Sequence, residues 1–255
     1  MRRFIRDKAI RFAVLMERIQ DKLIWNASNL KQLMFHANLP VNKKANFLVI
    51  SDERYVKALE VAVNSFLSHH YEFNAIIHTD QKLLEKIKEI VRSSPYFRKI
   101  EIRLIGKPED WSTEKLRIID EMLGTQDYYL DVDTRTNGRF PFTEEIIFFV
   151  DEGLLIKITE ADFSETSYNM LNTTFFSWSG ITMNKPTGIL EIFQTLEKKY
   201  KNSEKERLLE QMALSIFIQK NHYEYKVLKS NDKSFDGGIL ESSYLGTTGR
   251  QIYRR

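Results

Sequence analysis

The stretch Tyr128-Tyr129-Leu130-Asp131-Val132-Asp133 joins a short apolar run to two carboxylates. We predict a buried strand over 128–130 that ends at the acids. At the carboxyl end of a parallel strand the chain turns out of the sheet, and ligands of α/β proteins bind at that edge. Both carboxylates can then approach one divalent cation. An oxygen-only ligand set favours Mg²⁺ or Mn²⁺, which usually keep waters and bridge to substrate phosphates.

Three strand–helix units precede this stretch. We predict strands over 45–50, 73–79 and 100–105, and helices over 53–69, 81–92 and 113–123. Alternation of strands with helices of this length implies a mainly parallel sheet with helices on both faces. The fold class is therefore α/β and Rossmann-like.

The alternation breaks down after Asp133. We predict a strand pair over 146–150 and 154–159 that turns at Asp151-Glu152-Gly153, and strand character over 172–184. Helices over 188–200 and 204–219, a strand over 223–228 and a loop-like tail over 236–255 follow. The predicted organisation is an N-terminal helical segment, 1–42, and one domain, 43–255. That domain divides into an α/β half, 43–135, and a mixed α+β half, 136–255.

Composition narrows the class of protein. The 255 residues include no cysteine, which excludes a disulfide scaffold and a thiolate metal site. No apolar run reaches the 18 residues of a membrane-spanning helix. Residues 1–45 carry ten basic and three acidic residues (10 − 3 = +7), and the remainder carries 28 and 32 (28 − 32 = −4). Because the basic excess is confined to the N-terminal segment, a general nucleic-acid binder is not expected.

The N-terminal segment has helical periodicity. Over residues 3–25 the apolar side chains share one face of a helix and charged side chains lie opposite. Such a helix can lie on an anionic membrane surface, or it can pack on the domain or on a second copy of the chain. We expect a cytoplasmic protein, with peripheral membrane contact and homodimerisation through this segment as alternatives.

Four further motifs flank the Asp-x-Asp stretch in a fixed order. They are Phe47-Leu-Val-Ile-Ser-Asp-Glu-Arg-Tyr55, Lys115-Leu-Arg117, Leu171-Asn-Thr-Thr-Phe175 and Glu210-Gln-Met-Ala-Leu214. Taken together, over about residues 45 to 250, the sequence resembles the family 8 glycosyltransferases of the GT-A fold. The resemblance implies transfer of a sugar from a nucleotide-diphosphate sugar to an acceptor hydroxyl on a glycan or lipid-linked glycan, assisted by Mn²⁺ or Mg²⁺.

The resemblance also implies a role for each matching position. Ser51, Asp52 and Tyr55 would hold the nucleotide, and Asp131 and Asp133 would hold the metal. Lys115 would face the donor's phosphates or its sugar, and Arg250 would contact the diphosphate. The catalytic positions near the transferred sugar and the acceptor would be Asn172, Glu210 and Gln211.

The sequence departs from the family at two places. Ser243 stands where the family has a metal-binding histidine, and the Asn172 motif lacks its glycine. Retention and inversion of the sugar's configuration therefore both remain open.

Other interpretations remain open beside the resemblance. Asp52 can cap the helix that follows it, and Lys115 and Glu210 can be solvated helix residues. The whole chain can also be a Mg²⁺-dependent phosphatase of the haloacid dehalogenase type, or a catalytically inactive domain that binds nucleotide sugars.

Overall fold

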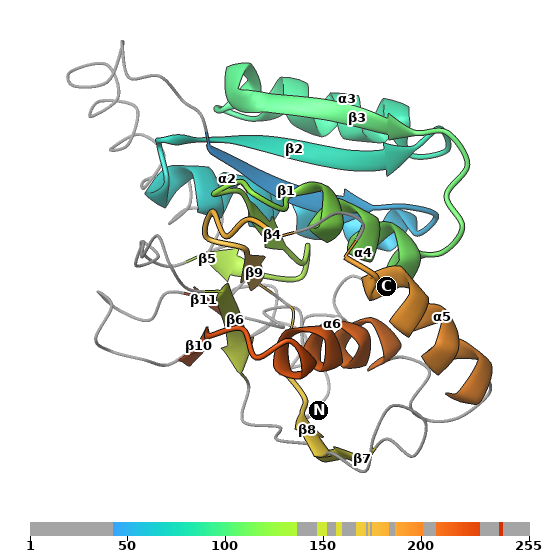
Figure 1. The fold of residues 1–255 in the computed structure, drawn as a ribbon. Helices are drawn as coiled ribbons and strands as arrows, with labels where there is room; N and C mark the ends of the chain where they lie inside the picture. Colours follow the sequence, from blue (N-terminus) through green and yellow to red (C-terminus); the bar gives the residue numbers. More distant parts are fainter. Residues whose placement is uncertain are drawn as a thin grey trace, which may run out of the picture.

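A seven-stranded sheet forms the centre of the molecule (Figure 1). The computed structural model describes residues 43–136, 147–151, 157–159, 167–171, 173, 175–183, 187–200, 208–229 and 240–241. The predicted N-terminal segment 1–42 lies outside these residues, as do the candidate positions Asn172, Ser243 and Arg250. No helix among the described residues is long and apolar enough to cross a membrane.

The first half of the chain contributes four neighbouring parallel strands, in the order β4-β1-β2-β3. The strands are β1 (Lys43–Val49), β2 (Phe73–Asp80), β3 (Ile100–Ile105) and β4 (Tyr128–Leu130). The connecting segments are η1 (Glu53–Tyr55), α2 (Val56–His69), α3 (Leu84–Ser93), η2 (Phe97–Lys99) and α4 (Trp111–Glu121). The predicted α/β alternation is confirmed. It could be predicted because each strand's apolar run and each helix's periodicity are local properties of the sequence.

The second half of the chain completes the same sheet. β9 (Phe175–Ser177) pairs antiparallel with β4 on one side and with β6 (Ile147–Asp151) on the other. β10 (Tyr225–Lys229) pairs parallel with β6, so every strand except β9 runs in one direction. The mainly parallel central sheet predicted from the sequence is confirmed.

Two details of the predicted second half are wrong. The strands at 146–150 and 154–159 do not form a hairpin, because β6 pairs with β9 and β10 while β7 (Lys157–Thr159) pairs with β8 (Ser167–Asn169). The tail is not entirely loop either. Within it β11 (Leu240–Glu241) pairs with β5 (Arg135–Thr136), directly after the Asp-x-Asp stretch.

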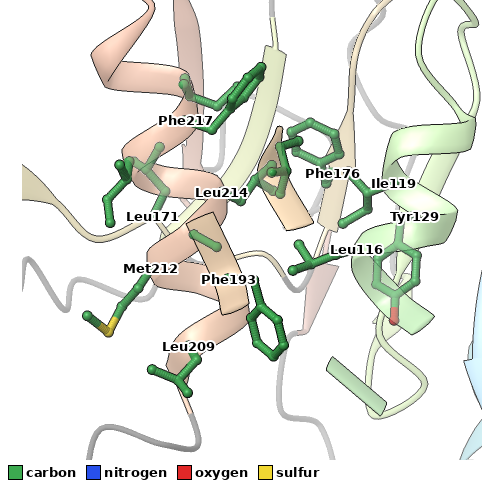
Figure 2. Close-up of a cluster of buried hydrophobic side chains, with 14 of the residues drawn as sticks. Leu116, Ile119, Tyr129, Leu171, Phe176, Phe193, Leu209, Met212, Leu214 and Phe217 are labelled. Carbon is green, nitrogen blue, oxygen red and sulfur yellow. The ribbon is translucent and has the colours of Figure 1, made fainter. Parts of the chain in front are cut away.

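Helices cover both faces of the sheet. Helices α2 and α3 pack on one face, where alternate β1 residues such as Phe47 and Val49 enter their apolar cluster. Helices α4, α5 (Ile189–Tyr200) and α6 (Leu209–Lys220) pack on the other face. Figure 2 shows side chains of α4 and α6 pointing toward one another in this second cluster. The indole N–H of Trp178 donates to the Ile119 carbonyl oxygen at 2.6 Å, so this large buried ring carries no unpaired donor.

A polar pair lies within the apolar sheet. His78 Nε2 lies 3.0 Å from Asn46 Oδ1, and Asn46 Nδ2 donates to the Tyr128 carbonyl oxygen at 3.2 Å. Burial, with a smaller effect of Arg103, lowers the pKa of His78 from 6.5 to about 4. His78 is therefore neutral in the folded protein at any pH above that value.

The buried histidine predicts a loss of stability in mild acid. The unfolded chain takes up a proton near pH 6.5, while folded His78 stays neutral down to about pH 4. The free energy of unfolding should therefore fall as pH decreases from 6.5 toward 4, by about 3 kcal/mol from this group. His78→Gln keeps a hydrogen-bonding amide near Asn46 and does not titrate. Urea unfolding at pH 7.0 and 4.5 should show about 2 kcal/mol less acid destabilisation in this variant than in the wild type.

The matched control is His222→Asn. His222 is exposed, and its left-handed backbone (φ 56°) is one that asparagine tolerates. This variant should keep the acid sensitivity of the wild type. Equal acid sensitivity of His78→Gln and the wild type would contradict the assignment of a buried neutral His78.

Candidate active site at the ends of β4 and α6

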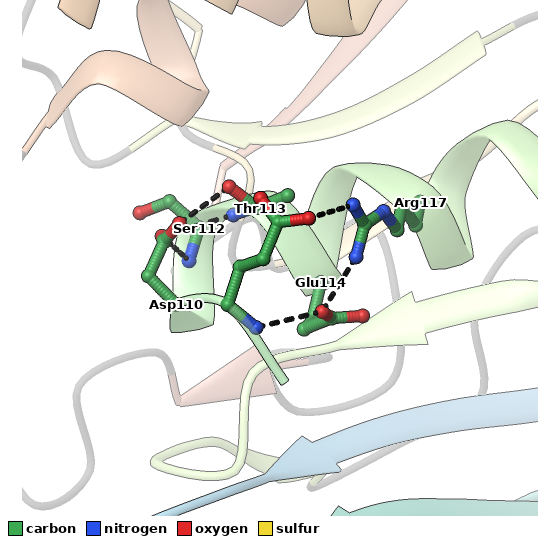
Figure 3. Close-up of polar contacts among 6 residues, drawn as sticks. Asp110, Ser112, Thr113, Glu114 and Arg117 are labelled. Atoms are coloured by element: carbon green, nitrogen blue, oxygen red, sulfur yellow. Dashed lines mark hydrogen bonds and ion pairs between the residues drawn. The ribbon is translucent and has the colours of Figure 1, made fainter. Parts of the chain in front are cut away.

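Helix α4 begins at a well-formed cap that orients its first turn (Figure 3). The Asp110 carboxylate accepts hydrogen bonds from the backbone N–H groups of Ser112 at 2.8 Å and Thr113 at 3.1 Å. An aspartate at this position satisfies donors that the helix leaves unpaired, and its charge complements the helix dipole. Trp111 and Lys115 are four residues apart and therefore lie on the same face of the helix.

Lys115 is a fully buried cation. Its side chain is 1% exposed, and Nζ donates to Asp131 Oδ1 at 2.9 Å and to Oδ2 at 3.2 Å. Nζ also lies 4.7 Å from the ring centroid of Trp111 and 5.1 Å from that of Tyr129. The alternative that Lys115 is a solvated helix residue is thereby excluded.

The alternation of β4 decides which side chains reach Lys115. Tyr128, Leu130 and Val132 enter the cluster under α2 and α3, whereas Tyr129 enters the cluster under α4 and α6. Asp131 follows Tyr129 by two residues and shares its face, as its contact with Lys115 shows. The strand ends at Leu130, and Asp133 follows in the turn, where its charge raises the pKa of Asp131. This turn thus brings the two carboxylates near one another, and within it the Thr134 N–H donates to the Asp131 carbonyl oxygen at 3.2 Å.

Glu210 supplies a third carboxylate from the first turn of α6. It is 3% exposed, and its Oε2 has no hydrogen-bond partner. Helix α6 has no side-chain cap at Leu208, and hydrogen bonds from the backbone of Glu210 and Gln211 and from the Gln211 side chain favour the Glu210 carboxylate. Glu210 therefore serves partly as the acidic group at its own helix start. It is not the solvated residue that the sequence left as an alternative.

Burial and mutual repulsion make this cluster of carboxylates unusual. Burial raises the pKa of Asp131 to about 7; Lys115 opposes this rise, and Asp133 and Glu210 add to it. Burial also raises the pKa of Glu210, while Lys115 and the helix N–H groups lower it. With all four groups ionised, three carboxylates face one ammonium, and the local charge is −3 + 1 = −2. Perturbed carboxyl groups of this kind cluster at functional sites.

The donor set fits a divalent cation. Asp131 and Asp133 offer hard oxygen ligands, and a divalent cation would offset the repulsion between carboxylates that helps to raise the pKa of Asp131. Among the described residues no three acidic, histidine or cysteine side chains are arranged to hold one ion. Such an ion would therefore depend on waters or on a bound phosphate for its remaining ligands, as Mg²⁺ commonly does.

A second strand-end turn contains the candidate nucleotide-binding residues. Ser51 adopts a left-handed backbone (φ 62°), and its N–H donates to Asp80 Oδ2 at 2.7 Å. Asp80 Oδ1 accepts from the Leu83 N–H at 3.0 Å, so this one carboxylate ties together the turns after β1 and β2. Asp52 accepts from the backbone N–H of Arg54 at 3.0 Å and pairs with its guanidinium, which holds the pKa of Asp52 below its usual value. Asp52 thus does cap the short helix that follows it.

The structure brings some of the predicted site residues together. Lys115, Asp131, Asp133 and Glu210 interact directly or electrostatically, and Gln211 adjoins Glu210. Ser51, Asp52 and half-buried Tyr55 lie after the neighbouring strand β1, and no contact of theirs with the Lys115 cluster is described. Sequence reasoning missed Trp111, Tyr129 and Asp80. The available signals were the four-residue spacing of Trp111 and Lys115 and the position of Asp80 at the end of a strand.

Comparisons with solved structures give distant likenesses of fold. The galactosyltransferase LgtC, in complex with donor and acceptor sugar analogs, is 13% identical, with 74% of this chain and 74% of that chain covered and a TM-score of 0.47. The glycosyltransferase GlyE of Streptococcus pneumoniae TIGR4 is 15% identical, with 84% and 51% covered and a TM-score of 0.49, so this chain spans about half of it. A 4-diphosphocytidyl-2C-methyl-D-erythritolsynthase of Anaerococcus prevotii DSM 20548 is 12% identical, with 83% and 94% covered and a TM-score of 0.46. No protein-family model and no curated protein matches the sequence. These likenesses concern the arrangement of strands and helices and do not identify a substrate.

The ion pair predicts a large coupling energy between Lys115 and Asp131. Lys115→Met leaves the Asp131 charge buried beside two other carboxylates, and the free energy of unfolding should fall by about 3–5 kcal/mol at pH 8. The double variant Lys115→Met/Asp131→Asn removes that unpaired charge and should recover at least about 2 kcal/mol of the loss. Urea unfolding of the two single variants and the double variant measures the coupling.

Lys88→Met on α3 is the control. Lys88 pairs with Glu85, and the two side chains are 39% and 75% exposed. Its loss should cost less than about 1 kcal/mol because solvent screens such pairs. Purely additive effects of Lys115→Met and Asp131→Asn would contradict the buried ion pair.

Proposed function

We propose that this protein is a glycosyltransferase of the GT-A type that uses a nucleotide-diphosphate sugar. The observation that carries the proposal is the buried Lys115 ammonium, held against Asp131 at the carboxyl end of β4 with Asp133 and Glu210 beside it. A buried cation among carboxylates at this edge of a parallel sheet suits a ligand that combines a diphosphate with sugar hydroxyls. The sequence resemblance to family 8 glycosyltransferases supports the same assignment.

Each of the chain's own groups has a proposed role in this reaction. Lys115 donates to the diphosphate as it departs and offsets its growing charge, an effect that is strong in a site with little water. Ser51, Asp52 and Tyr55 hold the nucleotide, in a turn that Asp80 already fixes. Glu210 and Gln211 orient hydroxyls of the transferred sugar, with Asn172 on the acceptor side and Arg250 on the diphosphate. Holding donor and acceptor in one geometry lowers the barrier by removing the entropic cost of their meeting.

Asp131 and Asp133 are the proposed ligands of Mn²⁺ or Mg²⁺. Such an ion, when bound, neutralises the leaving diphosphate as a Lewis acid. Both oxygens of Asp131 accept hydrogen bonds from Lys115, so binding of the ion would redistribute these hydrogen bonds.

The phosphatase of the haloacid dehalogenase type remains a weaker alternative, and no feature of the described residues favours it. Hydrolysis of simple phosphate esters in the absence of any nucleotide sugar would support it. The inactive nucleotide-sugar-binding domain is distinguished by binding without turnover. Titration with a panel of nucleotide sugars in the presence of Mn²⁺ therefore separates all three functions.

Asp133→Asn is the most direct test of the metal-assisted transfer. Asp131 is unsuitable, because its replacement leaves the buried Lys115 charge without its partner. Asp133→Asn should lower transfer, or hydrolysis of the responsive nucleotide sugar, by about 100-fold or more, the scale seen when an electrostatic group at a reacting centre is lost. Far-ultraviolet circular dichroism should remain that of the wild type.

Two comparisons keep this test specific. Glu85→Gln, on the exposed face of α3 with a side chain that is 75% exposed, should leave the rate unchanged. Excess chelator should abolish wild-type turnover, and added Mn²⁺ should restore it. Full activity in excess chelator would contradict the metal assignment. Failure to bind any nucleotide sugar would contradict the proposed function itself.

We further propose that the basic segment 1–42 carries a contact of this enzyme outside the site. Its charge suits an anionic membrane that holds a lipid-linked acceptor, and its apolar stripe suits a second copy of the chain. Flotation with anionic vesicles at low and high salt, with and without residues 1–42, distinguishes the two contacts. Salt-sensitive flotation of the full chain alone identifies the membrane. A change of oligomeric state on truncation, without flotation, identifies self-association.

A further inference from the structure

Trp111 occupies the first position of helix α4 and covers one side of Lys115. Its ring centroid lies 4.7 Å from Lys115 Nζ, and the ring is half-buried against the cluster of α4, α5 and α6. Tyr129 approaches the same ammonium, with its ring centroid at 5.1 Å. Tyr129 lies within the Tyr128–Asp133 stretch and Trp111 lies outside the motifs, but the sequence indicated no role for either ring.

Among the described residues, the hydrogen bonds of the ammonium go to the carboxylate of Asp131. A buried ammonium needs further favourable surroundings, because its desolvation costs several kcal/mol. The electron-rich faces of aromatic rings supply such surroundings, and tryptophan does so best.

We propose that Trp111 is a positioning residue for Lys115. Its indole and the Tyr129 ring form a seat for the ammonium. This seat takes the place of water around the ammonium, and Asp131 remains the anion to which the ammonium donates. When a diphosphate enters, the seat holds the ammonium in place while its hydrogen bonds are redistributed. This inference rests on the proposed function, since the diphosphate is the donor's leaving group.

The sequence around Trp111 fixes the ring in this place. The Asp110 cap sets the first helical turn, as its bonds to Ser112 and Thr113 show. The four-residue spacing then puts the indole over the Lys115 side chain. A residue that only filled the core would act through its volume and shape, whereas a contact with the ammonium through a ring face requires an aromatic side chain.

The test compares Trp111→Phe with Trp111→Leu. In lysine ¹³C-labelled protein, the ring currents of Trp111 and Tyr129 should shift the ε-methylene signal of Lys115 upfield, and Lys115→Arg assigns that signal by removing it. Trp111→Phe should keep most of the shift and bind UDP with Mn²⁺ within about threefold of the wild type. Trp111→Leu should lose a large part of the shift and bind UDP about tenfold more weakly, as expected when a desolvated cation–π contact is removed.

Phe193→Leu is the matched control. It removes a ring that is 4% exposed from the same apolar cluster, on the neighbouring helix α5. This variant should keep both the Lys115 signal and the UDP affinity. The proposal is overturned if Trp111→Leu leaves the signal in place, or if it loses the signal but binds UDP as tightly as the wild type. If the wild type binds no nucleoside diphosphate and no nucleotide sugar of the panel, the proposed function fails, and the ring-current shift still decides whether the seat exists.

Discussion

The cost of burying one ammonium governs the architecture around the candidate site. Lys115 has almost no contact with solvent, and several elements meet to compensate its charge. Helix α4 brings the cation and Trp111, strand β4 brings Tyr129 and Asp131, and helix α6 brings Glu210. If any of these elements shifted, an unpaired charge would remain in a region of low polarity, which is among the most destabilising situations in a folded protein. The packing of α4 against α6 therefore also fixes the position of the candidate site.

The excess of carboxylates over cations determines which ligands would stabilise this site. Three carboxylates surround the single cation, and burial together with their repulsion raises the pKa of Asp131 to about 7. A site in this condition is stabilised by whatever brings positive charge to the carboxylates, while Lys115 attracts anions. A ligand that carries both, such as a diphosphate with its divalent counter-ion, satisfies both demands at once. This complementarity follows from the positive charge of Lys115 and the negative charge of the carboxylates, and it does not depend on the resemblance to any family.

The sequence predicted the first half of the fold because its signals are local. Apolar runs such as 45–50 and the helical period that follows each strand identify the elements, and parallel pairing follows from their alternation. The second half was predicted less well for a different reason. Asp151-Glu152-Gly153 resembles a hairpin turn, yet the neighbours of β6 are β9 and β10, because its place in the sheet is decided by contacts distant in sequence.

The candidate site shows the same division between local and distant information. The predicted end of a strand at Leu130 accounts for the place of Asp131 and Asp133, and a motif drew attention to Lys115 and Glu210. The contact of Lys115 with Asp131, however, joins a helix to a strand end, and nothing in the local pattern of either element specifies it. Trp111 was missed because a tryptophan at a helix start is normally explained by the core, and its relation to a cation becomes visible only in three dimensions.

The antiparallel strand of the central sheet, β9, has a consequence for the order in which the chain folds. β9 joins β4 to β6, so the later strands enter the sheet through it. As the chain is synthesised, β1 to β4 with α2 and α3 can bury most of one apolar cluster before β9 emerges from the ribosome. The opposite apolar cluster is completed only when α5 and α6 arrive. Helix α6 also carries Glu210, so the docking of this late helix completes the candidate site.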